Sequence, residues 1–250
     1  KVAVNIVGQD TAGYAIKDAG SNQSGEHLFM YQLAPDGAPS IDANAFTWQG
    51  GRQSWLHPDM PYVLNVDISE PNGGSDLDSV SVSLAGNQGS DPLTIEWNFE
   101  TGNCTSLSNH IFIDDCVMLG EDGPATPYEK DMTLQIELHL AWTMPDLGET
   151  RREPVISVSD RAGNEVSRSF AENRWKFSAA MEVPEESVNL HLSSGTLLGD
   201  GARLGPNSAL EISGGVVFAE TGTIPSFNCS IDILFSGQSK SAISHQGIWN

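Results

Sequence analysis

The sequence predicts an all-β protein built from antiparallel β-sandwich modules. Several short segments alternate apolar and polar residues, which is the pattern of half-buried strands. The chain contains 25 glycines and 13 prolines, and they separate these segments. The best helix candidate, Glu182–Ser187, is short and contains a proline, so it favours no more than a turn. Two packed antiparallel sheets bury such strands most simply, and a jelly roll is the alternative.

The first strands of the central region are Tyr62–Ile68 and Val80–Leu84, and an acidic loop, Ser69–Asp78, joins them. Both segments alternate with a period of two, so we expect a half-buried antiparallel pair. Leu93–Trp97 follows, with apolar residues at every second position, and Ile111–Ile113 is a further short strand.

Met132–Trp142 is the longest alternating segment, with apolar residues at each even position from Met132 to Trp142. This length predicts a central strand of the sandwich. Because Trp97, Trp142 and Trp175 lie in strands, we expect them in the core. His139 alternates with the apolar positions, which predicts that it faces solvent.

The segment Val155–Asn164 (VISVSDRAGN) has a near copy, Val4–Gly13 (VNIVGQDTAG), in which Asp10 precedes Asp160 by 150 positions. Val80–Leu84 similarly matches Ile231–Phe235 after 151 positions, and Trp97-Asn98 matches Trp249-Asn250 after 152. Such self-similarity indicates whole domains in tandem. The Asp-x-Ala-Gly motif is interpreted as a turn, because an aspartate can accept backbone amide hydrogen bonds there and glycine permits a positive φ.

These matches predict three parts: residues 1–34 as closing strands of a preceding module, 35–180 as a complete module and 181–250 as the first part of the next. Pro35–Pro39 reads as a linker. The last module stops at Trp249-Asn250, the counterpart of Trp97-Asn98, and has no segment that corresponds to residues 99–154. It is therefore expected to lack strands. Either the protein is longer, or the N-terminal strands of one copy complete the last module of another copy.

The charge of the chain excludes one class of partner. Acidic residues number 33 against 12 basic ones, and the formal net charge is −21. This charge repels the phosphates of nucleic acids. No apolar run is long enough to insert into a membrane. The acidity fits a soluble surface and equally fits a protein that gathers divalent cations.

The three cysteines and three sequons are candidate sites of disulfide formation and, in an exported protein, of glycosylation. Cys104 and Cys116 are twelve positions apart, a loop that a disulfide can close between neighbouring strands; two buried free thiols are the alternative. Cys229 is left over, with a partner beyond residue 250 or none. The glycosylation candidates are Asn22, Asn103 and Asn228, each two positions before a serine or threonine.

The VSVSDRAGN segment and the acidic loop from Asp67 to Val80 together resemble prokaryotic immunoglobulin-like domains, which stand in tandem in large cell-surface proteins, archaeal ones especially. This resemblance implies an extracellular architectural role, such as part of a surface layer, an adhesin or a filament. It implies no reaction, and it permits calcium at the junctions between domains. The module of about 150 residues is longer than is usual for such domains, so an insertion is expected.

The acidic loop is the best candidate site. Asp67, Glu70, Asp76 and Asp78 offer several carboxylate oxygens within a short segment, and calcium prefers such ligands. A solvated acidic turn is the competing interpretation, and no other cofactor is indicated. A second acidic group, Asp114, Asp115, Glu121 and Asp122, is weaker because it spans a strand and a loop.

No nucleophile motif, phosphate loop or dinucleotide fingerprint occurs, so we expect no enzyme. We predict a structural or adhesive cell-surface or filament protein whose partners are neighbouring modules or further copies. The alternative is a carbohydrate-binding module that holds surface glycans on Trp48 and Trp55, two tryptophans in a polar, glycine-rich stretch. The competing interpretation is that both close the end of the sandwich.

Overall fold

We describe the fold from a computed structural model, which covers residues 37–86, 91, 93–145, 150–199, 202, 203, 205, 209–235 and 238–249. The chain divides into two units, Lys1–Gly37 and Ala38–Asn250, and all that follows concerns the second. The closing strands expected in residues 1–34 lie outside the described residues. The division of the chain into modules therefore stays a prediction.

The described chain is all-β, as predicted, because its alternating segments form strands and its only helices are single 3-10 turns. The strands are β1 Phe46–Trp48, β2 Trp55–Leu56, β3 Tyr62–Ser69, β4 Leu77–Ser83, β5 Thr94–Asn98, β6 Asn103–Ser106, β7 Ile111–Gly120, β8 Gly123–Pro124, β9 Asp131–Leu140, β10 Val155–Asp160, β11 Glu165–Ser169, β12 Lys176–Phe177, β13 Met181–Glu182, β14 Asn189–Leu192, β15 Leu210–Gly215, β16 Val217–Phe218, β17 Ser230–Phe235, β18 Gln238–Ile243 and β19 Ile248–Trp249. The 3-10 turns are η1 Gly74–Asp76, η2 Ala171–Asn173 and η3 Glu185–Ser187.

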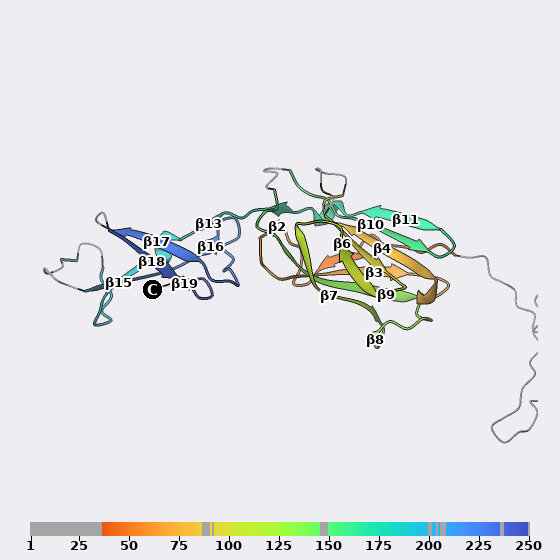
Figure 1. Ribbon diagram of the computed structural model, residues 1–250, viewed down its shortest axis with the longest axis horizontal. Helices are drawn as coiled ribbons and strands as arrows, with labels where there is room; N and C mark the ends of the chain where they lie inside the picture. The colour runs from red at the N-terminus through yellow and green to blue at the C-terminus, as the bar shows by residue number, and fades with distance from the viewer. Residues whose placement is uncertain are drawn as a thin grey trace, which may run out of the picture. The chain divides into compact units, whose positions relative to one another are not determined.

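Two five-stranded antiparallel sheets form a sandwich between residues 38 and 180 (Figure 1). One has the order β1-β3-β9-β7-β8, and the other has the order β11-β10-β4-β5-β6. The longest alternating segment forms β9 at the centre of the first sheet, where it pairs with β3 and β7. The prediction of a central strand is therefore confirmed.

The predicted pairing of Tyr62–Ile68 with Val80–Leu84 is wrong. These segments form β3 and β4, which lie in different sheets. Each strand buries one face, and that pattern is shared by hairpin neighbours and by strands that pack across a core. The acidic loop between them is therefore a crossing from one sheet to the other, with η1 at its end.

The main core fills the space between these two sheets. Trp97 and Trp175 belong to it, as predicted, and the indole of Trp175 donates a 2.9 Å hydrogen bond to the Leu84 carbonyl. Trp142 does not belong to it, because β9 ends at Leu140 and the Trp142 side chain is 42% exposed. Its indole donates to the Asp59 carboxylate instead.

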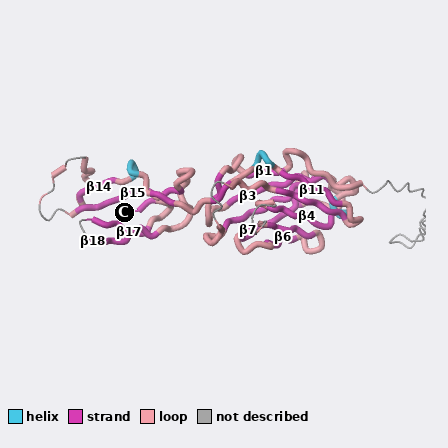
Figure 2. The backbone as a smooth tube through the Cα atoms, turned by 90° about the horizontal axis from the view of Figure 1, so that it is seen from above, coloured by secondary structure: helices cyan, strands magenta, loops and turns pink. Residues whose placement is uncertain are grey.

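Residues 181–249 form smaller sheets around a second, smaller core, and Figure 2 shows β14, β15, β17 and β18 in one group. The pairings are β13 with β16, β14-β15-β19, and β17 with β18, all antiparallel. Val216, Cys229 and Trp249 are the buried apolar residues at the centre of this core. The predicted turn at Glu182–Ser187 corresponds to η3.

Two short connections join the edges of the sandwich. The predicted disulfide between Cys104 and Cys116 is present, and it links β6 to β7, which belong to different sheets. β12 pairs in parallel with β2, so Lys176 lies opposite Trp55. Cys229 is a buried free thiol within the described residues.

Candidate metal centre

Three carboxylates from two distant segments meet at one end of the sandwich. They belong to Glu70, Asp76 and Asp160, and one oxygen of each lies within 4.8 Å of the other two. Glu70 is fully buried, Asp160 is 2% exposed and Asp76 is partly buried. Among the residues that the structure describes, no other group of three metal-binding side chains comes together in this way.

Glu70 takes its position from the end of β3. Its backbone amide donates a 2.7 Å hydrogen bond to the Lys130 carbonyl, which continues the pairing of β3 with β9 by one residue. One carboxylate oxygen accepts a 2.9 Å bond from the amide of Asn72. The Glu70 side chain is therefore held against the acidic loop and is buried beneath it.

Asp76 takes its position from a tight turn that only glycines permit. Gly73 has φ +96°, and a Cβ on Gly74 would meet the Met132 sulfur at 2.8 Å and the Thr126 carbonyl at 3.1 Å. The loop packs closely against residues 126–129 as a result. The Asp76 carboxylate accepts a 3.1 Å bond from the Asn72 side chain, which ties it to the Glu70 side of the loop.

Asp160 is the last residue of β10 and the first of the Asp-x-Ala-Gly turn. One of its carboxylate oxygens accepts a 2.8 Å bond from the Asn164 amide, and the other accepts a 2.7 Å bond from the Asn164 side chain. Gly163, with φ +88°, lets the chain turn back into β11. The predicted turn role is confirmed, and the same carboxylate also faces Glu70 and Asp76.

The charges at this end of the sandwich are unbalanced. Among the described residues, neither Asp76 nor Asp160 forms an ion pair with a lysine or arginine. The neighbouring Arg161 lies with its guanidinium 4.6 Å from the centre of the Phe99 ring. Three carboxylates held this close repel one another, and burial strengthens the repulsion. An all-oxygen set without histidine or thiolate fits calcium better than zinc.

The sequence identified only part of this site. Of the four predicted ligands, Glu70 and Asp76 belong to the cluster, whereas Asp67 and Asp78 lie outside it. Asp67 is exposed on β3, accepts a 2.6 Å bond from the Thr133 hydroxyl and lines an open cleft of about 490 Å³. Asp78 is exposed on β4. Side chains alternate between the two faces of a strand, and Asp67 on β3 and Asp78 on β4 both lie on exposed faces.

Asp160 was missed as a ligand because its sequence context indicated a turn. It lies 84 positions beyond Asp76, and only the pairing of β10 with β4 brings the two together, with Asp160 opposite Leu77. A signal was present, since an aspartate at the end of an alternating segment marks the position where a strand ends and a loop begins. The second acidic group does not assemble, because Asp114 binds the His139 ring at 2.9 Å and Asp115 bonds the amide of Cys116.

The predicted sugar-binding tryptophans do not form a platform. Trp48 is 4% exposed and packs edge to face against Phe46 and Tyr62, so the prediction that it stacks on sugars is wrong. It closes the sandwich instead. Trp55 is partly exposed, and the Lys176 amine lies 5.1 Å from the centre of its ring.

The candidate glycosylation residues Asn103 and Asn228 are exposed, whereas Asn22 lies outside the described residues. Glycosylation of these residues stays a prediction. The part of the chain that the structure describes contains no helix with the length and apolar character to cross a membrane.

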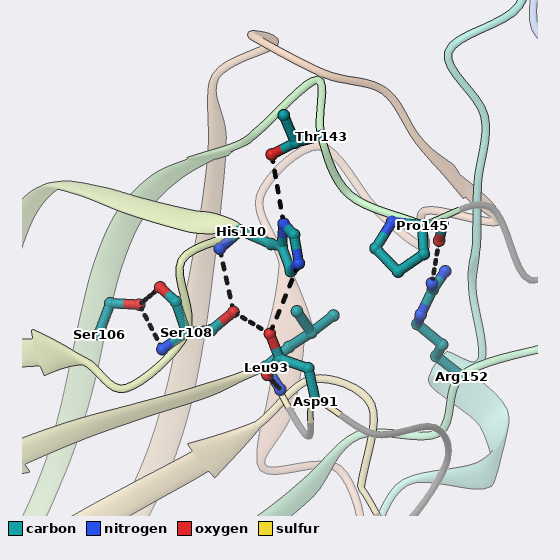
Figure 3. Close-up of polar contacts among 8 residues, drawn as sticks. All are labelled: Asp91, Leu93, Ser106, Ser108, His110, Thr143, Pro145 and Arg152. Carbon is teal, nitrogen blue, oxygen red and sulfur yellow. Dashed lines mark hydrogen bonds and ion pairs between the residues drawn. The ribbon is translucent and has the colours of Figure 1, made fainter.

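A serine, a histidine and an aspartate also meet near the β6–β7 turn, but they do not form a nucleophile (Figure 3). The Ser108 hydroxyl donates a 2.5 Å bond to Asp91 and accepts the backbone amide of His110 at 3.1 Å. The His110 ring nitrogen Nε2 lies 4.0 Å from the same Asp91 oxygen. In a catalytic triad the histidine stands between the serine and the acid, whereas here both contact the acid. The group fastens the turn to the segment before β5.

His57 lies where the two cores approach each other. Its ring stacks on Phe218, with ring centres 4.1 Å apart, Nδ1 lies 2.8 Å from the Ser178 carbonyl and Nε2 lies 2.9 Å from the Thr221 hydroxyl. A carbonyl only accepts, so Nδ1 carries the proton and Nε2 accepts from Thr221. Burial lowers the pKa of His57 below its usual 6.5, and the Ser178 bond and Glu220 partly oppose this.

Comparison with known proteins gives no family. No family model matches the chain, and no curated protein matches it. Two solved structures of BcpA, the major pilin subunit of Bacillus cereus, are similar at 9% identity, with TM-scores of 0.36 for a variant and 0.33 for BcpA itself. Each comparison covers 82% of this chain, which spans 63% of the pilin chain. These TM-scores do not establish a shared fold, so the function is argued from the residues of this protein.

Proposed function

We propose that this protein is a non-catalytic structural component of a cell surface, built from immunoglobulin-like repeats and able to associate into filaments or surface arrays. The observation that carries the proposal is the recurrence, at both ends of the chain, of segments that form parts of one two-sheet sandwich at its centre. Val155–Asn164 supplies β10 and its turn, and its copy precedes the sandwich, while the counterpart of β4 follows it. Repetition of a self-contained module is the construction of stalks, layers and fibres.

An extracellular location accords with the covalent structure of the sandwich. The Cys104–Cys116 disulfide is typical of oxidising compartments. Asn103 and Asn228 are exposed, as N-glycosylation requires. The net charge of −21 keeps such a protein soluble outside the cell and disfavours nucleic-acid partners.

Calcium is the proposed cofactor, and Glu70, Asp76 and Asp160 are its proposed protein ligands. A calcium ion takes six to eight oxygens, so backbone carbonyls and water would complete its coordination. The ion neutralises most of the repulsion among the three carboxylates. It also ties the crossing loop between β3 and β4 to the end of β10, which stiffens this end of the sandwich.

The test is the thermal midpoint of unfolding in calcium and in chelator, measured by calorimetry. Binding to the folded state alone stabilises it by about 2.7 kcal/mol when calcium is at 100 times its Kd. For a chain of this size that corresponds to a rise of roughly 5–10 °C. An unchanged midpoint at millimolar calcium would exclude the metal site.

Electron microscopy of the purified protein tests the structural role separately, because only an assembling protein forms regular filaments or sheets.

Surface glycans are not favoured as partners. The sugar-binding alternative requires exposed aromatic rings, and Trp48 is buried while the Trp55 ring is covered on one face by Lys176. Adhesion through protein contacts between modules or copies stays part of the proposal.

A further inference from the structure

A few side chains form the contact between the sandwich and the second core, and we call this contact the joint. Its members are His57, Asp59 and Trp142 from the sandwich and Phe218, Thr221 and Phe227 from residues 181–249. At its centre the His57 ring stacks on Phe218, with ring centres 4.1 Å apart and planes 7° from parallel. Beside it, Trp142 meets Phe227 edge to face, with ring centres 5.4 Å apart.

The chain between the two cores runs along the same contact. Residues 178–180 connect β12 with β13. The Ser178 amide donates to the Leu56 carbonyl at 3.2 Å, and the Ala180 carbonyl accepts the Ala219 amide at 3.0 Å. The Ser178 carbonyl lies 2.8 Å from Nδ1 of His57. The His57 ring therefore contacts both the connection and the second core, so a change in its charge acts on both.

The hydrogen bonds of His57 fit a neutral ring. Nδ1 donates to the Ser178 carbonyl, so Nε2 is an acceptor and the Thr221 hydroxyl donates to it at 2.9 Å. The Thr221 oxygen in turn accepts the Thr223 amide at 3.2 Å. A second proton on the ring makes Nε2 a donor and takes this acceptor away from the Thr221 hydroxyl. It also charges a ring that is 2% exposed and lies flat against Phe218.

The titratable neighbours of His57 do not offset this cost. Burial lowers the pKa of His57, and the backbone hydrogen bond and the Glu220 carboxylate raise it by less. The Tyr62 hydroxyl on β3 accepts the His57 amide at 2.7 Å, and it stays neutral because burial raises its pKa to about 12. The Asp59 carboxylate accepts the indole of Trp142. The closed joint therefore holds a neutral His57.

We propose that the joint fixes the second core against the sandwich near neutral pH and releases it in mild acid, when His57 takes up a second proton. Release brings the ring into water, where both nitrogens can donate, and leaves residues 178–180 as a hinge. Each core stays folded through the change, because the two cores are built from different residues. The joint is thus a pH-sensitive connection between two folded parts.

Proton linkage sets the size of the effect. The closed joint favours the neutral ring, so its stability is fully present above the unfolded pKa of about 6.5 and falls as the pH drops below that value. Uptake of one proton raises the ratio of open to closed molecules by at most about tenfold per pH unit. Between pH 7.5 and pH 5 the limit is about 30-fold.

Single-molecule energy transfer between two dyes measures the ratio of open to closed molecules. The dyes are attached to Glu165→Cys on β11 and Glu211→Cys on β15, two exposed strand positions outside the joint. Cys229→Ser in the same chain removes the free thiol. Phe227→Ala deletes the contact with Trp142 and provides the reference for the open joint.

Two further variants isolate the proton. His57→Gln keeps a donor and an acceptor at this position but does not titrate, so the ratio should be the same at pH 7.5 and pH 5. His245→Gln removes an exposed histidine outside the joint and should respond to acid as the parent protein does. Near-ultraviolet circular dichroism at both pH values reports whether the cores remain packed.

The expected result for the parent is an open-to-closed ratio about 5- to 30-fold higher at pH 5 than at pH 7.5, with the added population matching that of Phe227→Ala. An unchanged ratio in the parent would overturn the proposal. An equal acid response in His57→Gln would overturn it too, because another group would then be the sensor. Loss of the near-ultraviolet signal at pH 5 would mean that the cores unfold and that the joint does not open first.

Discussion

Asp160 combines two tasks within one side chain. It closes the turn after β10 through Asn164, and it turns the same carboxylate toward Glu70 and Asp76. The turn fixes the position of the carboxylate before any ion is bound. A preorganised ligand costs less entropy on binding, so this residue is expected to contribute more to metal affinity than an exposed aspartate does.

Asp160→Asn is predicted to abolish the calcium-dependent rise of the thermal midpoint. The amide keeps the size and much of the turn bonding but removes one of three negative charges. In chelator the variant should be as stable as the parent protein or more stable, because repulsion with Glu70 and Asp76 falls. Calorimetry with and without calcium measures both effects. Asp78→Asn, an exposed change on β4, serves as the control and should retain the full calcium response.

Comparison of the calcium responses of these two variants decides between a metal site and a buried acidic turn. If Asp160→Asn and Asp78→Asn respond to calcium equally, the cluster of Glu70, Asp76 and Asp160 does not bind the ion. Loss of stability in chelator would show that the Asp160 carboxylate stabilises the fold through the turn alone.

His57 is predicted to make the protein less stable in mild acid. Burial lowers its pKa in the folded state, so the unfolded chain binds more protons and stability rises with pH. The contribution is fully present above the unfolded pKa of about 6.5 and falls as the pH drops below that value toward the folded pKa. Urea unfolding at pH 7.5 and at pH 5 measures the free energy of unfolding. Its decrease between these two pH values should be smaller for His57→Gln than for the parent protein.

The exposed His245 provides the control for this pH dependence. His245→Gln should leave the loss between the two pH values unchanged, since its ring stays in water in both states. An equal decrease in the free energy of unfolding for the parent protein and for His57→Gln would contradict this prediction. It would mean that the His57 ring is protonated within the folded protein without loss of stability, for example after a shift of Thr221.

At the scale of elements, the crossing between β3 and β4 decides where the site lies. Had these strands formed a hairpin, the acidic loop would be a solvent-exposed tip. Because they lie in different sheets, the loop closes the end of the sandwich, and Glu70 becomes buried. The disulfide makes a second link between the same two sheets, at β6 and β7.

Removing the disulfide by Cys104→Ser with Cys116→Ser is predicted to lower the free energy of unfolding by about 3 kcal/mol, the entropy gained by the unfolded chain when a loop of this length opens. Urea unfolding at equilibrium measures the change. Cys229→Ser is the comparison for loss of a thiol, since Cys229 is buried but not cross-linked. A double variant as stable as the parent would indicate that residues 104–116 are held equally well by the β5–β6 and β7–β9 pairings.

Sequence patterns predicted the elements well and their partners less well. Alternation found β3, β4, β9 and β10, because burial of one face leaves a period of two in the sequence. The same alternation does not say which sheet a strand joins, so β3 and β4 were wrongly paired. Trp142 was placed in the core because the apolar pattern continued through it, whereas β9 ends two residues earlier.

The site residues were likewise predicted only where they are close together in the sequence. Glu70 and Asp76 are close in sequence and were predicted, whereas Asp160 joins them only through the pairing of β10 with β4. Asp67 and Asp78 lie outside the cluster, and a sequence window does not show which face of a strand a residue occupies. Long-range pairing carries this information, and local spacing does not.

At the scale of the whole molecule, charge opposes assembly. Each copy carries a formal charge of −21, so copies repel at low ionic strength. The Debye length falls from about 30 Å at 0.01 M to about 10 Å at 0.1 M salt. We therefore predict that association, followed by light scattering, increases between 10 and 150 mM sodium chloride. Stronger association at the lower concentration would indicate that ion pairs, and not apolar contacts, hold the copies together.

In the structural role proposed above the protein would bear tension, and the disulfide limits how far the chain can be extended. A sandwich pulled open from its two ends lengthens by about 3.5 Å for every residue released. The residues between Cys104 and Cys116 are excluded from this extension, because the covalent bond keeps the two Cα atoms 5.9 Å apart. The unfolded sandwich is thereby shortened by roughly 35 Å. The loop enclosed by the disulfide stays slack while the rest of the module is stretched, so in an oxidising environment the chain keeps a reserve of length that only a reductant releases.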